Sequence, residues 1–217
     1  MKIFLLSIGL AWVVLSAQAQ WKEPWSKGEI ILADGERLAG ELVFASDAEV
    51  VSLKMGDGTL KAYNSAQIQS FHFQDIRRKF LRRFKTSVLP DSGREAIVEI
   101  VIEGAVEVQR CLRNRPKGSF GPIYNYFPDE PIQHSVFRYY VHDGLYLCSM
   151  EHFLKKTYRQ KTGRWRSKLD LFKTRNNLDN GIESWLRVLL FYNALEEEWR
   201  ERQLPFEKIQ TTDEITL

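Results

Sequence analysis

Histidines, serines and carboxylates are the side chains that usually build catalytic and metal sites, and in this chain they are scattered. The four histidines are His72, His134, His142 and His152, and no pair of them has metal-ligand spacing. No G-x-S-x-G motif and no Gly-rich phosphate loop occurs. We therefore predict no catalytic residue, no metal and no cofactor. An enzyme remains the least favoured hypothesis, as a hydrolase whose site forms only in three dimensions.

Two carboxylates, Glu99 and Glu103, lie four residues apart in a stretch that has the alternation of a strand. This spacing places both on one face of a strand. We expect that face to be exposed to solvent, so the pair is not interpreted as a general acid and base.

The chain has two cysteines, Cys111 and Cys148, each in a stretch typical of a strand. In an oxidising compartment they form a candidate disulfide, because neighbouring strands bring Cα atoms within bonding range. The alternative is two separate buried thiols. Neither belongs to a C-x-x-C pair, which argues against a thioredoxin-like redox role.

A basic run, "RRKFLRRFK" at 77–85, is the one segment with a specific binding chemistry. Its six basic residues are interleaved with apolar ones, a pattern that suits an anionic lipid or glycan surface. The alternative is that its aromatic face packs inside and its basic face is solvated or pairs with Glu196, Glu197 and Glu198. Helix and strand are both open here. The candidate anionic-surface residues are Arg77, Arg78, Lys79, Arg82, Arg83 and Lys85. A second basic stretch, 155–168, contains Tyr158 and Trp165.

The first residues resemble a secretory signal peptide. Lys2 precedes an almost wholly apolar run at 3–15, and Ala17-Gln18-Ala19 has the small-x-small form of a cleavage site. We predict cleavage after Ala19 and export to the periplasm or the outside of the cell. The apolar run is short for a membrane span, which needs about 20 apolar residues. No transmembrane segment is expected in the mature chain.

Residues 28–75 predict a β-meander of five short strands. Tight turns are expected at Asp34-Gly35 and at 56–58, because glycine accepts a positive φ at little cost. Short strands with tight turns favour a small, strongly bent sheet or barrel. Two further hairpins are predicted, one with Ala96, Val98, Ile100 and Ile102 on one face, the other around His142-Asp143-Gly144.

The period becomes helical from Ser149, which is a candidate N-cap. Ser167 and Asp170 have capping-box spacing, and Asp179 or Asn180 precedes the clearest helix. The predicted fold class is α+β: an N-terminal small β-barrel-like meander, further β-hairpins and C-terminal helices. The predicted divisions are a signal peptide at 1–19, a barrel-like module at 20–75, a basic segment with hairpins at 76–148, and a helical segment at 149–217. Residues 113–134 are expected to form a long loop.

Charge is unevenly distributed. Residues 75–175 carry 21 basic and 11 acidic side chains, whereas residues 176–217 carry 4 basic and 9 acidic ones. A formal net charge of +3 for the whole chain therefore conceals a basic middle.

The stretch "ILADGERLAGELV" resembles the first motif of Sm-like small barrels. Asp34 and Gly35 match its turn, and Gly40 matches its bend in the second strand. Two of the motif's positions differ: Ser46 stands at its Asp and Val50 at its RNA-binding Asn, and its second motif is not found. The resemblance therefore implies a fold, without the nucleic-acid binding of that family.

The order of parts along the chain is similar to that of a group of exported bacterial proteins of unknown function. The resemblance lies in the signal peptide, "DGERLAGELV", "IQSFHF", "VEIVIEG" and "FKTRNNL…LLFYNAL". It implies no activity. Our leading hypothesis is a non-catalytic exported protein that binds another protein of the cell envelope or a secreted one. The alternative is a binder of anionic lipid or glycan through 77–85.

Overall fold

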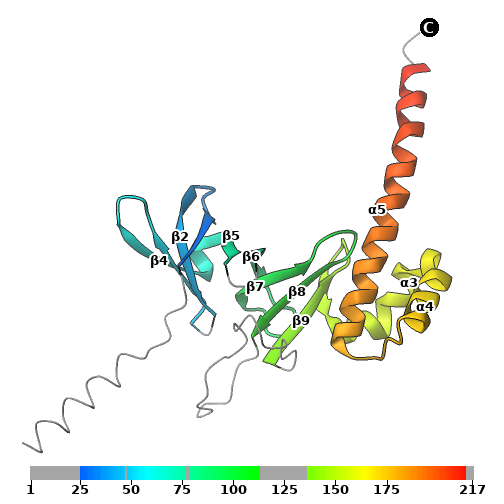
Figure 1. Ribbon diagram of the computed structural model, residues 1–217, viewed down its shortest axis with the longest axis horizontal. Helices are drawn as coiled ribbons and strands as arrows, with labels where there is room; N and C mark the ends of the chain where they lie inside the picture. The colour runs from blue at the N-terminus through cyan, green and yellow to red at the C-terminus, as the bar shows by residue number, and fades with distance from the viewer. Residues whose placement is uncertain (1–24, 47, 77–78, 113–135, 214–217) are drawn as a thin grey trace, which may run out of the picture.

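The structure, a computed structural model, describes residues 25–46, 48–76, 79–112 and 136–213, with side chains described as far as Gln203. Ten strands form one antiparallel sheet in the order β10-β9-β8-β7-β6-β5-β1-β2-β3-β4 (Figure 1). The α+β prediction is confirmed, with the sheet first and the helices at the C-terminal end. The strands are β1 (Ser26–Leu32), β2 (Arg37–Ala45), β3 (Val50–Lys54), β4 (Leu60–Asn64), β5 (Ile68–Asp75), β6 (Phe80–Val88), β7 (Glu95–Ile102), β8 (Glu107–Leu112), β9 (Phe137–His142) and β10 (Leu147–Ser149).

Strands β1 to β4 pair in chain order as predicted for a meander, whereas β5 returns to pair with β1 and not with β4. β1 pairs with both β2 and β5, and a short 3-10 helix, η1 (Ser65–Gln67), connects β4 to β5. The turns fall at the predicted glycines, with φ of 91° at Gly35 and 86° at Gly58. These values lie in the region where glycine has no steric penalty.

An aromatic core fills this bent part of the sheet. The rings of Phe71 and Phe84 stack with centroids 4.5 Å apart, and Phe44 meets both of them edge to face. The cluster is apolar and buried, and comprises Ile30, Leu38, Leu42, Phe44, Val51, Leu53, Tyr63, Ile68, Phe71, Phe73, Phe84 and Ile97. Phe84 and Ile97 come from β6 and β7, so the core extends beyond the first five strands.

Residues 80–88 of the basic segment form strand β6, which settles the open choice between helix and strand. β6 pairs with β5 through Ser70–Asp75 and with β7 through Arg83–Val88. The sheet therefore continues across residue 75. The division of 20–75 from 76–148 stays a prediction. The predicted signal peptide and the predicted loop at 113–134 lie outside the described residues.

Strand β7 differs from its prediction, because both of its faces are covered. Ala96 and Val98 belong to one buried cluster, and Ile102 belongs to the cluster beneath the helices. The β7–β8 register shifts between Ile100 and Ile102, as at a β-bulge. The bulge moves Ile102 to the other face. The prediction that 96, 98, 100 and 102 share one face is therefore wrong.

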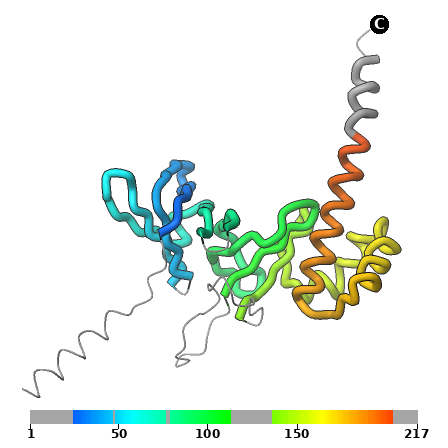
Figure 2. Tube along the Cα trace, in the orientation of Figure 1, coloured from blue at the N-terminus to red at the C-terminus, as the bar shows by residue number. Residues whose placement is uncertain are grey.

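Helices cover one face of the sheet beside β7 to β9 (Figures 1 and 2). Ser149 is the predicted N-cap, since its Oγ accepts a hydrogen bond from the His152 backbone N–H at 3.2 Å. The Ser167 capping box is wrong, because the helix begins at Arg166 with Trp165 as its N-cap residue. The helical elements are α2 (Met150–His152), the π-helical η3 (Phe153–Thr157), α3 (Tyr158–Lys161), the 3-10 turn η4 (Gly163–Trp165), α4 (Arg166–Arg175) and α5 (Ile182–Asp213).

The long helix α5 is fixed to the sheet by one buried amide as well as by apolar contacts. Its Val188, Leu189 and Tyr192 are buried against the sheet. The Asn193 Oδ1 accepts from the Val106 N–H at 2.9 Å, and its Nδ2 donates to the Glu103 and Val106 carbonyls. Asn193 thus satisfies the backbone of the β7–β8 turn, whose groups lie outside the strand ladder.

Candidate functional site

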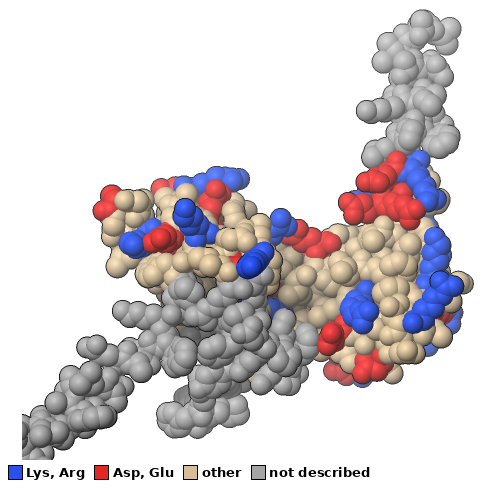
Figure 3. All heavy atoms as spheres, viewed as in Figure 1, with Lys and Arg blue, Asp and Glu red and all other residues tan. Residues whose placement is uncertain are grey.

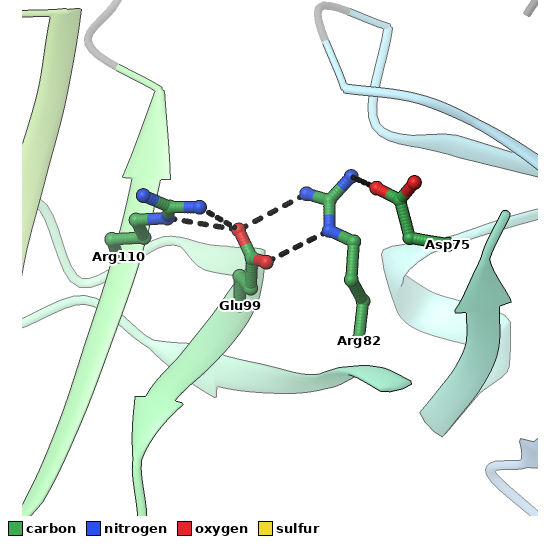
Figure 4. Close-up of polar contacts among 4 residues, drawn as sticks. All are labelled: Asp75, Arg82, Glu99 and Arg110. Carbon is green, nitrogen blue, oxygen red and sulfur yellow. Dashed lines mark hydrogen bonds and ion pairs between the residues drawn. The ribbon is translucent and has the colours of Figure 1, made fainter. Parts of the chain in front are cut away.

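Four charged side chains meet inside the sheet where β5, β6, β7 and β8 lie side by side (Figure 4). Arg82 donates from Nε and Nη2 to the two carboxylate oxygens of Glu99, at 2.8 and 3.0 Å. Arg110 on β8 donates from Nε to the Glu99 Oε2 at 2.8 Å. Asp75 lies on the far side of Arg82, with its Oδ2 at 3.9 Å from Nη1. Arg82, Glu99 and Arg110 are buried, which contradicts the expectation that Glu99 faces solvent.

Aromatic rings cover the guanidinium groups of this cluster. The Arg82 guanidinium lies 4.9 Å from the centroid of the Phe84 ring, and that of Arg110 lies 4.5 Å from the centroid of Phe137. A cation over a ring face is attracted by the quadrupole of the ring, more strongly where water is absent. The rings therefore stabilise the cations and exclude water from the carboxylate between them.

The electrostatics of the cluster suit a structural role. Burial by itself would raise the pKa of Glu99, but the charges of Arg82 and Arg110 and their hydrogen bonds outweigh burial and hold it below its usual value. Glu99 is therefore ionised at neutral pH and has both oxygens occupied. A general acid or base needs a pKa near the working pH and access to substrate. Glu99 has neither property.

The basic run at 77–85 does not form one basic face. Arg77 and Arg78 lie outside the described residues, and Lys79 is exposed in the β5–β6 turn with φ of 58°. Arg82 is buried in the cluster. Arg83 pairs with Glu103 and Lys85 pairs with Glu107 at 2.7 Å. The acidic partners of Arg83 and Lys85 thus come from the β7–β8 turn and from β8, and not from Glu196–Glu198.

Cys111 and Cys148 are free thiols, so the candidate disulfide is not formed in this structure. Strand β9 lies between their strands, β8 and β10. Cys111 packs with Tyr140 in one buried cluster, and Cys148 lies in the cluster beneath the helices. Burial raises the pKa of the Cys111 thiol to about 11, so this thiol is a poor nucleophile.

The described residues contain no group of three or more His, Cys, Asp or Glu side chains able to hold a metal ion. His72, His142 and His152 lie on separate elements, and His134 falls outside the description. An open hollow of about 500 Å³ lies beside β9 and the start of α5. Its carboxylates come from Asp91 and Glu151. Asp91 accepts hydrogen bonds from Arg138 and Tyr140.

Among the described residues, exposed basic side chains are concentrated on the helical segment. Nine Lys or Arg side chains and three carboxylates occur between Met150 and Gly181. In Figure 3, basic side chains lie over this part of the molecule, while acidic ones gather where α5 extends beyond it. Arg164, Lys168, Leu171 and Arg175 have the i, i+4, i+7, i+11 spacing of one helix face. All four are exposed.

Tryptophans form the layer beneath this face. The Arg164 guanidinium lies 4.7 Å from the Trp199 ring centroid, and the Lys168 ammonium lies 4.9 Å from that of Trp165. The two indoles meet edge to face, with centroids 6.2 Å apart. The Trp165 Nε1 donates to Glu196 at 2.7 Å. The indole rings thus hold the charged ends of Arg164 and Lys168 in place on this exposed face.

Comparisons with protein-family models, with curated proteins and with solved structures find no match for this chain. The resemblances to Sm-like barrels and to exported bacterial proteins therefore stay predictions. Among the described residues, none of the helices is both long and apolar enough to cross a membrane.

Proposed function

We propose that this protein is a non-catalytic binding protein whose helical segment attaches to a surface that presents many anionic groups. The observation that carries the proposal is the exposed face of Arg164, Lys168 and Arg175 around Leu171. Guanidinium groups bind phosphates and carboxylates through two parallel hydrogen bonds. A surface with several such groups allows all the cations to bind at once. The proposed ligand class is the one expected from the sequence for the 77–85 run, but the proposed binding site is now the helical segment.

The distribution of the cations along the helical segment, and their weak pairing with carboxylates, favour an extended anionic surface over a small anion as the partner. Lys155 pairs with Glu151, and Arg166 lies 3.9 Å from Asp170, but these pairs are on the surface and contribute little. The remaining cations on η3, α3 and α4 are spread over several turns of helix. A single small anion would reach only one or two of them.

Charge reversal with matched controls tests this proposal. Arg159→Glu combined with Arg175→Glu removes two exposed cations of the helical segment, and Lys27→Glu with Lys61→Glu makes the same charge change on exposed residues of β1 and β4. We expect the first pair to abolish sedimentation with anionic phospholipid vesicles and the second to leave it nearly intact. Binding should weaken with salt, because the Debye length falls to about 8 Å at physiological ionic strength. Equal effects of both pairs would refute the assignment of binding to the helical segment.

A second function, binding to another protein, is favoured by exposed apolar residues at the β5–β6 turn. Ile76 is 59% exposed, Phe80 43% and Leu81 42%. Exposed apolar groups of this size are typical of protein contact sites when they occur together. A photo-reactive residue at position 81 tests it: a defined protein adduct in intact cells supports this function, and internal adducts alone argue against it.

A further inference from the structure

The β9–β10 turn carries the most exposed large apolar side chain among the described residues. Leu145 is 85% exposed, and its neighbour Tyr146 is 48% exposed. The turn is formed by Asp143 and by Gly144, whose φ is 96°. An exposed aliphatic side chain alone has no special meaning. Its meaning here comes from how the turn is held.

Polar contacts fix the tip in one conformation. The Asp143 carboxylate accepts from the backbone N–H groups of Leu145 and Tyr146 at 3.0 and 3.1 Å. The Asp143 N–H donates to the Tyr146 carbonyl, which closes the turn. The backbone N–H groups of the tip are therefore hydrogen-bonded at the turn, and the exposed Leu145 side chain extends from this bonded base. An apolar side chain on an ordered turn loses little conformational entropy when it is buried in a binding partner.

The tip is also attached to the basic helical segment. The Tyr146 hydroxyl lies 3.3 Å from the Thr157 Oγ1 at the end of η3, and the Lys161 Nζ donates to the Asp143 carbonyl. Lys156 and Arg159, both exposed, are neighbours of Thr157 along the same helical stretch. Leu145 and these cations therefore belong to one connected unit.

We propose that the anionic surface is a phospholipid bilayer and that Leu145 inserts into the boundary between its headgroups and acyl chains; this inference rests on the proposed function. Cations near the tip attract anionic headgroups. Tyrosine suits the depth just above an inserted leucine, because its ring is apolar and its hydroxyl is polar. A soluble polyanion has no apolar phase for Leu145, and one face each of Trp165 and Trp199, the rings that could stack on a sugar, is covered by a cation.

Leu145→Ser tests the insertion, and Leu60→Ser is its control. Leu60 is also an exposed leucine next to a turn, at 65% exposure on β4. The full chain is bound to vesicles of phosphatidylglycerol and phosphatidylcholine, and separately to inorganic polyphosphate as a soluble polyanion. Burial of a leucine side chain predicts that Leu145→Ser weakens vesicle binding about tenfold. Polyphosphate binding by Leu145→Ser, and vesicle binding by Leu60→Ser, should match the unaltered protein.

The outcomes separate the two proposals. Unchanged vesicle binding by Leu145→Ser overturns the insertion and leaves the proposed function standing. Equal losses from Leu145→Ser and Leu60→Ser also overturn it. If the unaltered protein binds neither vesicles nor polyphosphate, both the insertion and the proposed function are overturned. As a direct readout, a benzophenone amino acid at position 145 should form adducts with lipid acyl chains. Absence of such adducts when the protein is bound to vesicles counts against insertion.

Discussion

Arg82 and Glu99 form two parallel hydrogen bonds between neighbouring strands β6 and β7, inside the sheet and away from water. Taking two charges out of water is costly, and their attraction offsets that cost only when the geometry is good. Here the carboxylate also accepts from Arg110, so its oxygens are well satisfied. The three side chains connect β6, β7 and β8. We infer that these contacts specify which strands pair more than they add to stability.

Glu99→Gln removes the only carboxylate between two buried guanidinium groups. The cations of Arg82 and Arg110 then remain buried with Asp75 as the nearest carboxylate of the cluster, 3.9 Å from one of them. We expect the free energy of unfolding to fall by about 3 kcal/mol or more. Chemical denaturation followed by circular dichroism measures it.

The matched control is Glu29→Gln, which breaks the surface pair between Glu29 and Arg37. That pair is exposed to solvent and should contribute less than about 1 kcal/mol. A Glu99→Gln protein as stable as the control would mean that the buried cluster is relaxed by water or by neighbouring groups.

The same carboxylate makes stability depend on pH. The pKa of Glu99 in the folded protein lies below its unfolded value of about 4.3. Its stabilisation is therefore fully present above that value and is lost as the pH falls through the folded pKa. We expect the free energy of unfolding to decrease in acid below about pH 4.3, and Glu99→Gln to flatten this dependence. An identical pH dependence for both proteins would assign acid sensitivity to other carboxylates.

The sequence patterns predict elements formed by local chemistry. The meander of β1 to β4, the Gly35 turn and the Ser149 N-cap follow from residues close together in the chain, whereas the pairing of β5 with β1 does not. The exposed basic helices contain the second basic stretch, 155–168, which the sequence also indicates. The Ser167 capping box failed because α4 begins one residue earlier, at Arg166, with Trp165, which packs against the core, at the N-cap position.

The buried polar contacts could not be predicted from local patterns. Glu99 has the alternation of a solvent-facing residue, and only the pairing of β7 with β6 and β8 places it between two arginines. Asn193 is likewise one polar residue in the apolar run 188–195 of α5, and its partners are in the β7–β8 turn. A polar residue inside an apolar run is the available signal, but its partner lies up to 90 residues away.

The two thiols should resist alkylation in the native protein. Burial raises the pKa of Cys111 to about 11 and raises that of Cys148, so little thiolate exists at pH 8. We expect iodoacetamide to modify neither residue quickly at pH 8, and to modify both once guanidinium unfolds the chain. Intact-mass measurement counts the adducts. Absence of modification after unfolding without reductant would mean that a disulfide joins them after all.

Gly40 in β2 is required because of a close backbone approach. A Cβ at this position would lie 2.4 Å from the Lys54 carbonyl oxygen of β3 and 2.7 Å from the Leu53 Cδ1. Glycine allows β2 and β3 to meet this closely. Gly40→Val should therefore lower the free energy of unfolding by about 2 kcal/mol or more, because the backbone must move and the buried Leu53 must repack.

Gly56→Ala is the matched control for this prediction. A Cβ at Gly56 would meet no atom within 4 Å, and its φ lies outside the positive region. Both variants are compared by thermal unfolding and by chemical denaturation. Chemical denaturation is needed because a lower melting temperature alone does not distinguish a local backbone shift from unfolding of the first five strands. We expect Gly56→Ala to change stability by less than about 1 kcal/mol. If Gly40→Val and Gly56→Ala have the same melting temperature, β2 and β3 lie further apart in solution than in this structure. The bend of the first five strands then has another cause.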